Sequence, residues 1–141
     1  MPMTEPAFEL HPRLAADSLP VCSLSLCAVH LMNDARFPWL LLVPRRPALT
    51  ELLDLSPADR RQCYQEIDQA AAALREIIVP DKLNIGALGN VVRQLHIHII
   101  ARFEADTAWP DPVWGKGTAT PYEASAAAVL ITRLQELLPN G

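Results

Sequence analysis

The sequence predicts an α+β domain whose sheet is mainly antiparallel. Strand-like and helix-like segments follow one another in the order strands, helix, strands, helix, and their connections are short. A doubly wound parallel sheet would need more alternation of strands and helices than the chain contains. The chain has 141 residues, of which 50% are hydrophobic and 20% charged. This length and composition suit one folded domain, and we expect residues 1–141 to form it.

The first strands of this sheet come from two apolar segments, which follow a short helix expected near Arg13–Asp17. Val21–Met32 alternates in part between polar and apolar residues, which is typical of a strand. After the polar residues 33–36, Trp39–Val43 is a continuous apolar run that Pro44 ends, as in a strand buried on both faces. The short polar connection predicts that the two strands pair antiparallel.

Two long helices are expected, each with a start signal. The first runs over Pro57–Ile78, where Ser56 is a good N-cap and the proline after it suits the first helical position. Its apolar spacing predicts one buried face, made of Tyr64, Ile67, Ala71, Leu74 and Ile78. The second runs over Pro121–Leu138, and Thr120 and Glu123 have the spacing of a capping box. Its apolar stripe is Leu130, Leu134, Leu137 and Leu138.

The remaining strands lie between the two helices. Leu83–Gly86 is short, and after a turn at residues 87–90 the clearest strand of the chain follows at Gln94–Arg102. Because side chains alternate across a strand, the residues of this last segment divide into two faces. One face is uniformly apolar and is expected in the core: Leu95, Ile97 and Ile99.

The opposite face carries an amide and two imidazoles in a row, Gln94, His96 and His98, about 7 Å apart. Three interpretations compete. The histidines lie on a solvent-facing surface, or they bind a metal whose third and fourth ligands have no local spacing in the sequence. Alternatively they perform nucleophilic or acid–base catalysis, which suits an imidazole at neutral pH. The turn favours a phosphate site, because Gly89 and Asn90 can bend the backbone so that its N–H groups point into one concavity.

Together these segments resemble the signature of the histidine-triad (HIT) family: Asn84-Ile85-Gly86, Gly89-Asn90 and Gln94-x-His96-x-His98-Ile99-Ile100. The likeness extends to Leu31–Asp34 and Val43–Pro47, so it covers about residues 20–105, the expected core. Pro44–Pro47 is more like the fragile-histidine-triad branch, whose members hydrolyse dinucleoside polyphosphates, and residues 109–115 look like a bacterial subgroup. The resemblance implies a HIT-like α+β fold with an antiparallel sheet of about five strands.

The resemblance also implies hydrolysis at the α-phosphate of a nucleotide derivative, through a covalent nucleotidyl-histidine. His96 matches the attacking histidine, and His98 matches the one that hydrogen-bonds the phosphate or the bridging oxygen. The implied nucleotide-binding positions are Asn33 for the ribose and, for the phosphate, Asn84, Gly89, Asn90, Val91 and Val92. No metal or other cofactor is implied, and because family members usually dimerise we expect a homodimer.

Gln94 departs from the family at the first triad position. An amide can donate and accept hydrogen bonds but cannot titrate, so a proton for the leaving group must come from His98 or water. Val91 stands where relatives often have a hydroxyl. Two functions therefore stay open. One is a hydrolase or nucleotidyl transferase that uses Gln94, His96 and His98; the other is a nucleotide-binding protein with little or no turnover.

Charge and cysteine content limit the kinds of partner and the cellular setting that we expect for this protein. The net charge of −4 argues against binding nucleic acid, although a local pocket of N–H groups can still hold one nucleotide. Cys22, Cys27 and Cys63 are too few for a disulfide framework, so a cytoplasmic setting is expected. We expect no signal peptide and no membrane span. Trp109 and Trp114 are expected to pack rather than to stack on a base.

Overall fold

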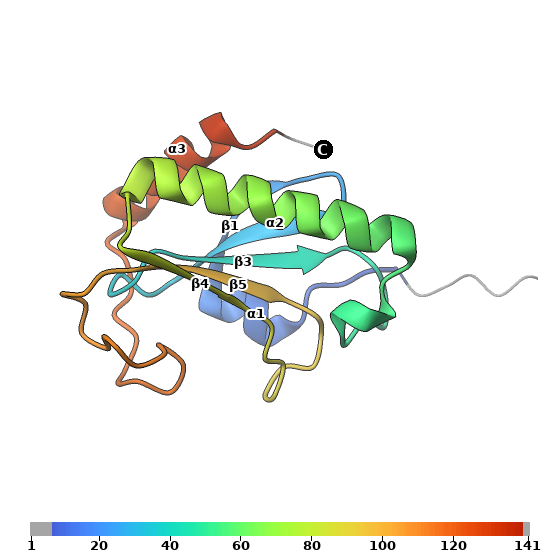
Figure 1. Cartoon of the computed structure of the whole chain (residues 1–141), viewed down its shortest axis with the longest axis horizontal. Coiled ribbons are helices and arrows are strands. Elements are labelled where there is room, and N and C mark those ends of the chain that lie inside the picture. Colours follow the sequence, from blue (N-terminus) through green and yellow to red (C-terminus); the bar gives the residue numbers. More distant parts are fainter. Residues whose placement is uncertain (1–6, 140–141) are drawn as a thin grey trace, which may run out of the picture.

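Five antiparallel strands form the sheet, in the order β1-β2-β3-β5-β4, in a computed structural model that describes residues 7–139 (Figure 1). The strands are β1 (Ser18–Ser23), β2 (Cys27–Met32), β3 (Trp39–Pro44), β4 (Lys82–Gly86) and β5 (Ile97–Arg102). The helices are α1 (Pro12–Asp17), the short 3-10 helix η1 (Leu52–Asp54), α2 (Pro57–Ile78) and α3 (Ala124–Leu137). The α+β class and the antiparallel sheet of five strands are confirmed.

The predicted first strand, Val21–Met32, is wrong in one respect, because it is two strands joined by a tight turn. β1 starts three residues earlier, at Ser18, and pairs with β2 so that Ser18 lies opposite Met32. The segment between the two strands has no glycine or proline to mark the turn. The predicted antiparallel pairing with the next strand is correct, since Ala28 on β2 lies opposite Val43 on β3.

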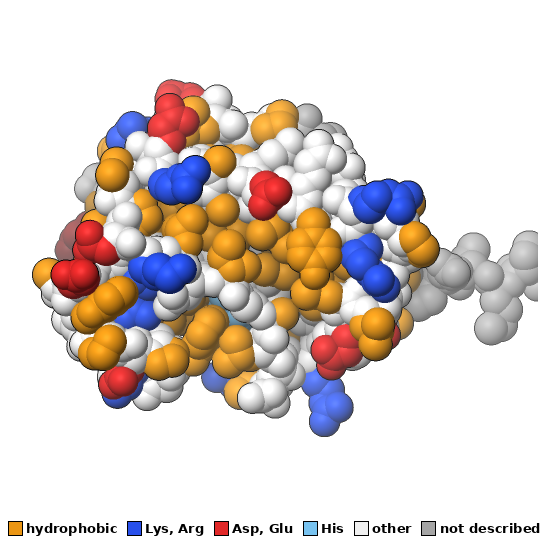
Figure 2. Space-filling model, in the orientation of Figure 1, with side chains coloured by type: hydrophobic (Ala, Val, Ile, Leu, Met, Phe, Trp, Pro, Cys, Tyr) orange, Lys and Arg blue, Asp and Glu red, His pale blue; other side chains and the backbone are white. Residues whose placement is uncertain are grey.

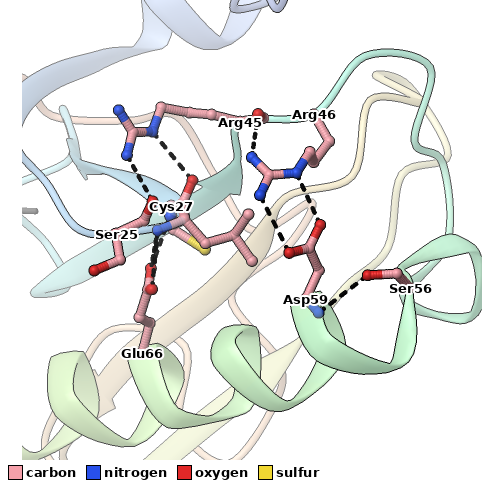
Figure 3. Close-up of polar contacts among 8 residues, drawn as sticks. Ser25, Cys27, Arg45, Arg46, Ser56, Asp59 and Glu66 are labelled. Carbon is pink, nitrogen blue, oxygen red and sulfur yellow. Dashed lines mark hydrogen bonds and ion pairs between the residues drawn. The ribbon is translucent and has the colours of Figure 1, made fainter.

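A buried carboxylate on α2 holds this turn (Figure 3). Glu66 is fully buried, and it accepts hydrogen bonds from the backbone N–H groups of Leu26, at 3.0 Å, and Cys27, at 2.7 Å. From the other side the guanidinium of Arg45 donates to the carbonyl oxygens of Ser25 and Leu26. The turn therefore depends on partners that lie 19 to 40 residues away in the sequence.

Helix α2 has the predicted bounds. The Ser56 hydroxyl accepts a hydrogen bond from the N–H of Asp59 at 3.1 Å, as an N-cap should. Tyr64 was expected in the buried face but is 52% exposed. The helix is rotated slightly from that prediction, so its buried positions are Cys63, Glu66, Ile67, Ala70, Ala71, Ala73 and Leu74.

Helix α3 begins at Ala124, later than predicted, and the capping box of Thr120 does not form. The backbone before the helix instead forms hydrogen bonds with the loop after β2. The N–H of Thr120 donates to the carboxylate of Asp34, and the N–H of Tyr122 donates to the Asn33 side chain at 2.9 Å. The loop after β2 thus holds residues that the helical pattern would otherwise have included.

Apolar side chains fill both faces of the sheet. Helices α2 and α3 cover one face, where Ile97 and Ile99 of β5 join the larger core (Figure 1). On the opposite face a smaller core contains Leu14 of α1, Ile100 of β5 and Val113 from the segment before α3. The alternation along β5 therefore places His98 on the face opposite α2, together with Ile100.

The strands of the sheet lie within residues 18–102, and the single domain over residues 1–141 with a core of about 20–105 stays a prediction. Within residues 7–139, no helix is long and apolar enough to cross a membrane. Residues 1–6, on which the expectation about a signal peptide depends, lie outside the described residues.

Candidate active site

A cleft of about 680 Å³ opens on the sheet face opposite α2. Its walls come from α1, the loop after β2, the turn at residues 88–92 and the segment 113–121, and its floor holds His96 and His98. A volume of this size is typical of small-molecule sites. The solvent-facing interpretation of the two histidines is therefore wrong, because His96 is 7% exposed and His98 is 5% exposed.

His96 lies just before β5, and a backbone contact orients its ring. Its Nδ1 is 2.7 Å from the carbonyl oxygen of Gln94. Because a carbonyl oxygen can only accept, Nδ1 must carry a proton, so the free electron pair of the neutral form of the ring lies on Nε2. No hydrogen bond to that Nε2 comes from residues 7–139. This is the tautomer that a nucleophilic imidazole needs.

His98 is held in the opposite state. The indole Nε1 of Trp39 lies 3.0 Å from His98 Nδ1, and because an indole can only donate, this Nδ1 is the acceptor. Burial, together with the neighbouring His96 ring, lowers the pKa of His98 to about 3. The two imidazole centroids are 4.9 Å apart. At neutral pH His98 is therefore an uncharged ring with its proton on Nε2. In the free protein it can donate a hydrogen bond from Nε2, but it cannot act as a general acid.

The predicted row of three side chains on one face is wrong at Gln94. The strand begins at Ile97, so the alternation does not extend back to this residue. Its amide turns instead to the N-terminal segment, where it accepts from the N–H of His11 at 2.9 Å and donates to the carbonyl of Glu9 at 2.8 Å. The Gln94 side chain is not among those that line the cleft. Only the backbone carbonyl of Gln94 contacts a triad residue, His96.

His11 is a residue that the sequence reasoning missed. Its ring Nδ1 accepts from the N–H of Arg13 at 3.1 Å and caps α1, while its own N–H holds Gln94. The only local signal is a polar residue directly before Pro12 at a helix start. The contact with Gln94 spans 83 residues and has no local signal.

The turn before β5 forms a wall of the cleft. Gly89, Asn90, Val91 and Val92 all line it, and Gly89 has a φ of 72°, a left-handed conformation that favours glycine. Asn84 is the exception among the predicted phosphate ligands. Its Oδ1 accepts from Arg102 Nη1 at 2.8 Å, and the residue does not line the cleft.

Asn33 lies in the cleft, and a buried ion pair holds the polar loop around it. Asp34 is 2% exposed and forms an ion pair with Arg36 at 2.7 Å. Burial raises the pKa of Asp34, but the hydrogen bonds from Arg36 and Thr120 outweigh burial and hold it below its usual value. Arg36 also donates to the carbonyl of Lys116 at 2.7 Å, which ties this loop to the segment 113–121.

A second buried ion pair supports the opposite wall. Arg102 is 1% exposed and pairs with Asp106 at 2.8 Å, while its Nη2 donates to the carbonyl of Asp111 at 2.9 Å. The hydrogen bond from Arg102 lowers the pKa of Asp106 to about 2. Arg102 thus organises the segment after β5 and is not a phosphate ligand. The segment brings Trp114 to within 5.3 Å of the His98 ring, edge-on.

Residues 7–139 contain no cluster of three or more His, Cys, Asp or Glu side chains that could hold an ion. The remaining histidine, His30, contacts the Ser18 hydroxyl at 3.0 Å and lies outside the cleft. Cys27 and Cys63 are fully buried in the larger core.

Comparisons with known proteins agree with this fold. The model of the HIT domain family matches residues 13–105, which is more than half of the chain. The chain therefore belongs to the histidine-triad family. A comparison with curated proteins finds no match.

Several solved structures are similar over almost the whole chain. A histidine triad protein from Bradyrhizobium japonicum is 46% identical, with a TM-score of 0.93, and the match covers 95% of this chain and all of that one. One from Sinorhizobium meliloti is also 46% identical, covering 93% and 97% of the two chains with a TM-score of 0.91. A third, from Marinobacter aquaeolei, is 41% identical, with coverage of 94% and 97% and a TM-score of 0.92.

Proposed function

We propose that this protein cleaves a nucleotide derivative at its α-phosphate, with His96 as the nucleophile. The observation that carries the proposal is the 2.7 Å contact between His96 Nδ1 and the Gln94 carbonyl, which leaves an electron pair on Nε2 at the floor of the cleft. The HIT family consists of nucleotide-binding hydrolases and transferases, which supports the same class of reaction.

The proposed reaction has two displacements. His96 Nε2 attacks the α-phosphorus, a P–N bond forms, and the bond from phosphorus to the leaving oxygen breaks. Water then attacks the same phosphorus, the P–N bond breaks, and a nucleoside monophosphate and a proton are released. His98 donates from Nε2 to a phosphate oxygen, and the N–H groups of the 89–92 turn face the remaining charge.

The protonation states favour phosphoric anhydrides over phosphoramidates as substrates. An amine leaving group must receive a proton as it departs, whereas a phosphate leaves as an anion. Gln94 cannot titrate and lies outside the cleft, and the pKa of His98 is lowered to about 3. We therefore propose a dinucleoside polyphosphate as the substrate class, with Asn33 as the ribose contact and Gly89, Asn90, Val91 and Val92 as the phosphate wall.

The test is to incubate the protein with diadenosine triphosphate, and separately with an adenosine phosphoramidate, and to follow AMP release. We expect faster release from the triphosphate, its loss in His96→Ala, and a covalent adenylyl adduct on His96 after quenching with denaturant at alkaline pH. His30→Gln is the matched control, because that histidine lies outside the cleft. Binding of AMP without any release would instead identify the second candidate, a nucleotide-binding protein with little turnover.

A homodimer is the second part of the proposal. Strand β4 is an edge of the sheet. An edge strand with exposed apolar side chains can pair with another chain, because its outer backbone groups have no strand beside them. Figure 2 shows hydrophobic side chains gathered across the middle of the face that α2 and β4 present. Tyr64 of α2 is 52% exposed, and Ile85 of β4 is 49% exposed. We propose that two copies pair through this face about a two-fold axis.

Analytical ultracentrifugation tests the dimer. We expect the wild-type protein to sediment as a dimer and Ile85→Glu to sediment as a monomer, because a charge would be buried in the interface. Leu53→Glu is the control, since Leu53 is 79% exposed on η1 and not on β4. A monomeric wild type would contradict the proposal.

The three cysteines are free thiols, which fits the proposed cytoplasmic setting.

A further inference from the structure

Trp39 makes a contact that the proposed function does not use. It is the first residue of β3 and lies opposite Ile100 of β5, so His98, two residues away on the same face, is its diagonal neighbour. The indole Nε1 and His98 Nδ1 are 3.0 Å apart, and Trp39 is only 7% exposed. The N–H of a buried tryptophan usually donates a hydrogen bond, and the acceptor of this one is His98, a residue of the site.

The surrounding rings leave the indole little freedom. Trp114 packs edge-on against Trp39, with the ring centroids 6.4 Å apart and an interplanar angle of 87°. Trp114 also packs edge-on against His98, at 5.3 Å and 80°. Three aromatic rings therefore contact one another in turn, and rotation of any one of them would disturb the other two.

We propose that the Trp39 indole N–H locks His98 as a neutral hydrogen-bond donor, so that Nε2 always presents its proton to the phosphate of the substrate. The reason is the chemistry of the donor. An indole N–H cannot accept, so a proton on His98 Nδ1 would face another proton across 3.0 Å. Protonation of His98 would therefore break this hydrogen bond and leave two N–H groups in contact. Trp39 is thus a positioning residue, acting through His98.

The charged and titratable groups around His98 do not counteract the lock. On its own segment the nearest titratable neighbour is His96, whose ring centroid is 4.9 Å away. The residues opposite His98 in the sheet, Leu41 on β3 and Gly86 on β4, carry no charge. The other charged residues line the walls of the cleft, and they include both signs: Arg13, Asp17, Asp34, Arg36 and Lys116. Burial independently lowers the pKa of His98.

This inference rests on the proposed function only for the ligand, because the protonation state belongs to the free protein. The first test is therefore ¹⁵N NMR of the histidine rings without ligand, between about pH 5 and pH 8. In the wild type we expect His98 to keep Nε2 protonated and Nδ1 unprotonated throughout. We also expect the Trp39 indole proton to be protected from exchange. A proton on Nδ1, or titration of His98 in this range, would overturn the proposal without any variant.

Two matched variants separate the N–H group from the ring packing. Trp39→Phe keeps an aromatic ring but removes the donor. Because burial still keeps His98 neutral, we expect its one proton to distribute between Nδ1 and Nε2 in this variant. Trp114→Phe removes an indole from the same cluster but not the bond to His98, and we expect the wild-type tautomer. The proposal is wrong if Trp39→Phe leaves the His98 spectrum unchanged, or if both variants change it equally.

The second test connects the lock to the ligand. A His98 ring with its proton on Nδ1 has no Nε2–H to donate to a phosphate. We therefore expect Trp39→Phe to bind AMP about fivefold more weakly than the wild type at neutral pH. Equal affinities of the two proteins for AMP overturn the functional role of the lock. Failure of both proteins to bind AMP contradicts the proposed function instead, and the NMR test still decides the lock.

Discussion

The buried pair of Arg102 and Asp106 gives a prediction whose size follows from the structure. The two side chains are 2% and 5% exposed and 2.8 Å apart. The hydrogen bond from Arg102 lowers the pKa of Asp106 from its ordinary value of 3.8 to about 2. The difference between these two values corresponds to about 2 kcal/mol of unfolding free energy at neutral pH. Removing one partner of a buried pair typically costs somewhat more, roughly 3–5 kcal/mol.

We therefore expect Asp106→Asn to lower the free energy of unfolding by about 3 kcal/mol at pH 7. The sign of the pH dependence follows from the lowered pKa. The carboxylate stabilises the folded state above the unfolded pKa, and this stabilisation disappears as the pH falls through the folded value of about 2. The difference in unfolding free energy between wild type and variant should thus be largest at pH 7 and should decrease progressively below about pH 5.

Equilibrium urea unfolding of both proteins at a series of pH values measures this difference. Asp111→Asn is the matched control, because Asp111 pairs with Lys116 at the surface, where the two side chains are 56% and 48% exposed. An exposed pair contributes less than about 1 kcal/mol. A loss below about 1 kcal/mol in Asp106→Asn, or a difference that stays constant in acid, would refute the reasoning.

Three further predictions concern other contacts. Gln94→Ala should lower the AMP release rate about tenfold or less, because the backbone carbonyl that orients the nucleophile remains, and it should cost about 1–2 kcal/mol of unfolding free energy for the lost side-chain bonds. Glu66→Ala should cost about 3 kcal/mol in urea unfolding, because two buried N–H groups lose their acceptor. Leu134→Ala should cost about 3 kcal/mol, since Leu134 is fully buried, whereas Leu137→Ala, 40% exposed, should cost less than about 1 kcal/mol. Abolished AMP release in Gln94→Ala, a Glu66→Ala loss under about 1 kcal/mol, or equal losses for the two leucines would contradict these expectations.

Local patterns in the sequence were sufficient for several elements. The bounds of α2 follow from Ser56, from the proline after it and from the apolar spacing, all of which act within a few residues. The alternation along β5 also predicts that Ile97 and Ile99 face the helices and that His98 faces the other way. Such features are correct because a strand or helix imposes its period on every side chain in it.

Other features depend on contacts between distant residues, and only the tertiary structure decided them. The turn after β1 needs Glu66, and the late start of α3 follows from the hydrogen bonds that Asn33 and Asp34 accept from the backbone before it. Tyr64 is exposed because a helix can rotate by a fraction of a turn without changing its own pattern. In each case the free energy comes from a partner that the local sequence does not contain.

The site divides in the same way. The sequence by itself determined the HIT family, the antiparallel sheet, and the presence of His96 and His98 on one face behind a glycine turn. It did not determine which side chains join them, because Gln94 turns away to the N-terminal segment and Trp39 comes from another strand. Proton positions on the two imidazoles depend on the donor or acceptor that each Nδ1 contacts. Those partners meet the rings only once the chain is folded, so the chemistry of the site belongs to the tertiary structure.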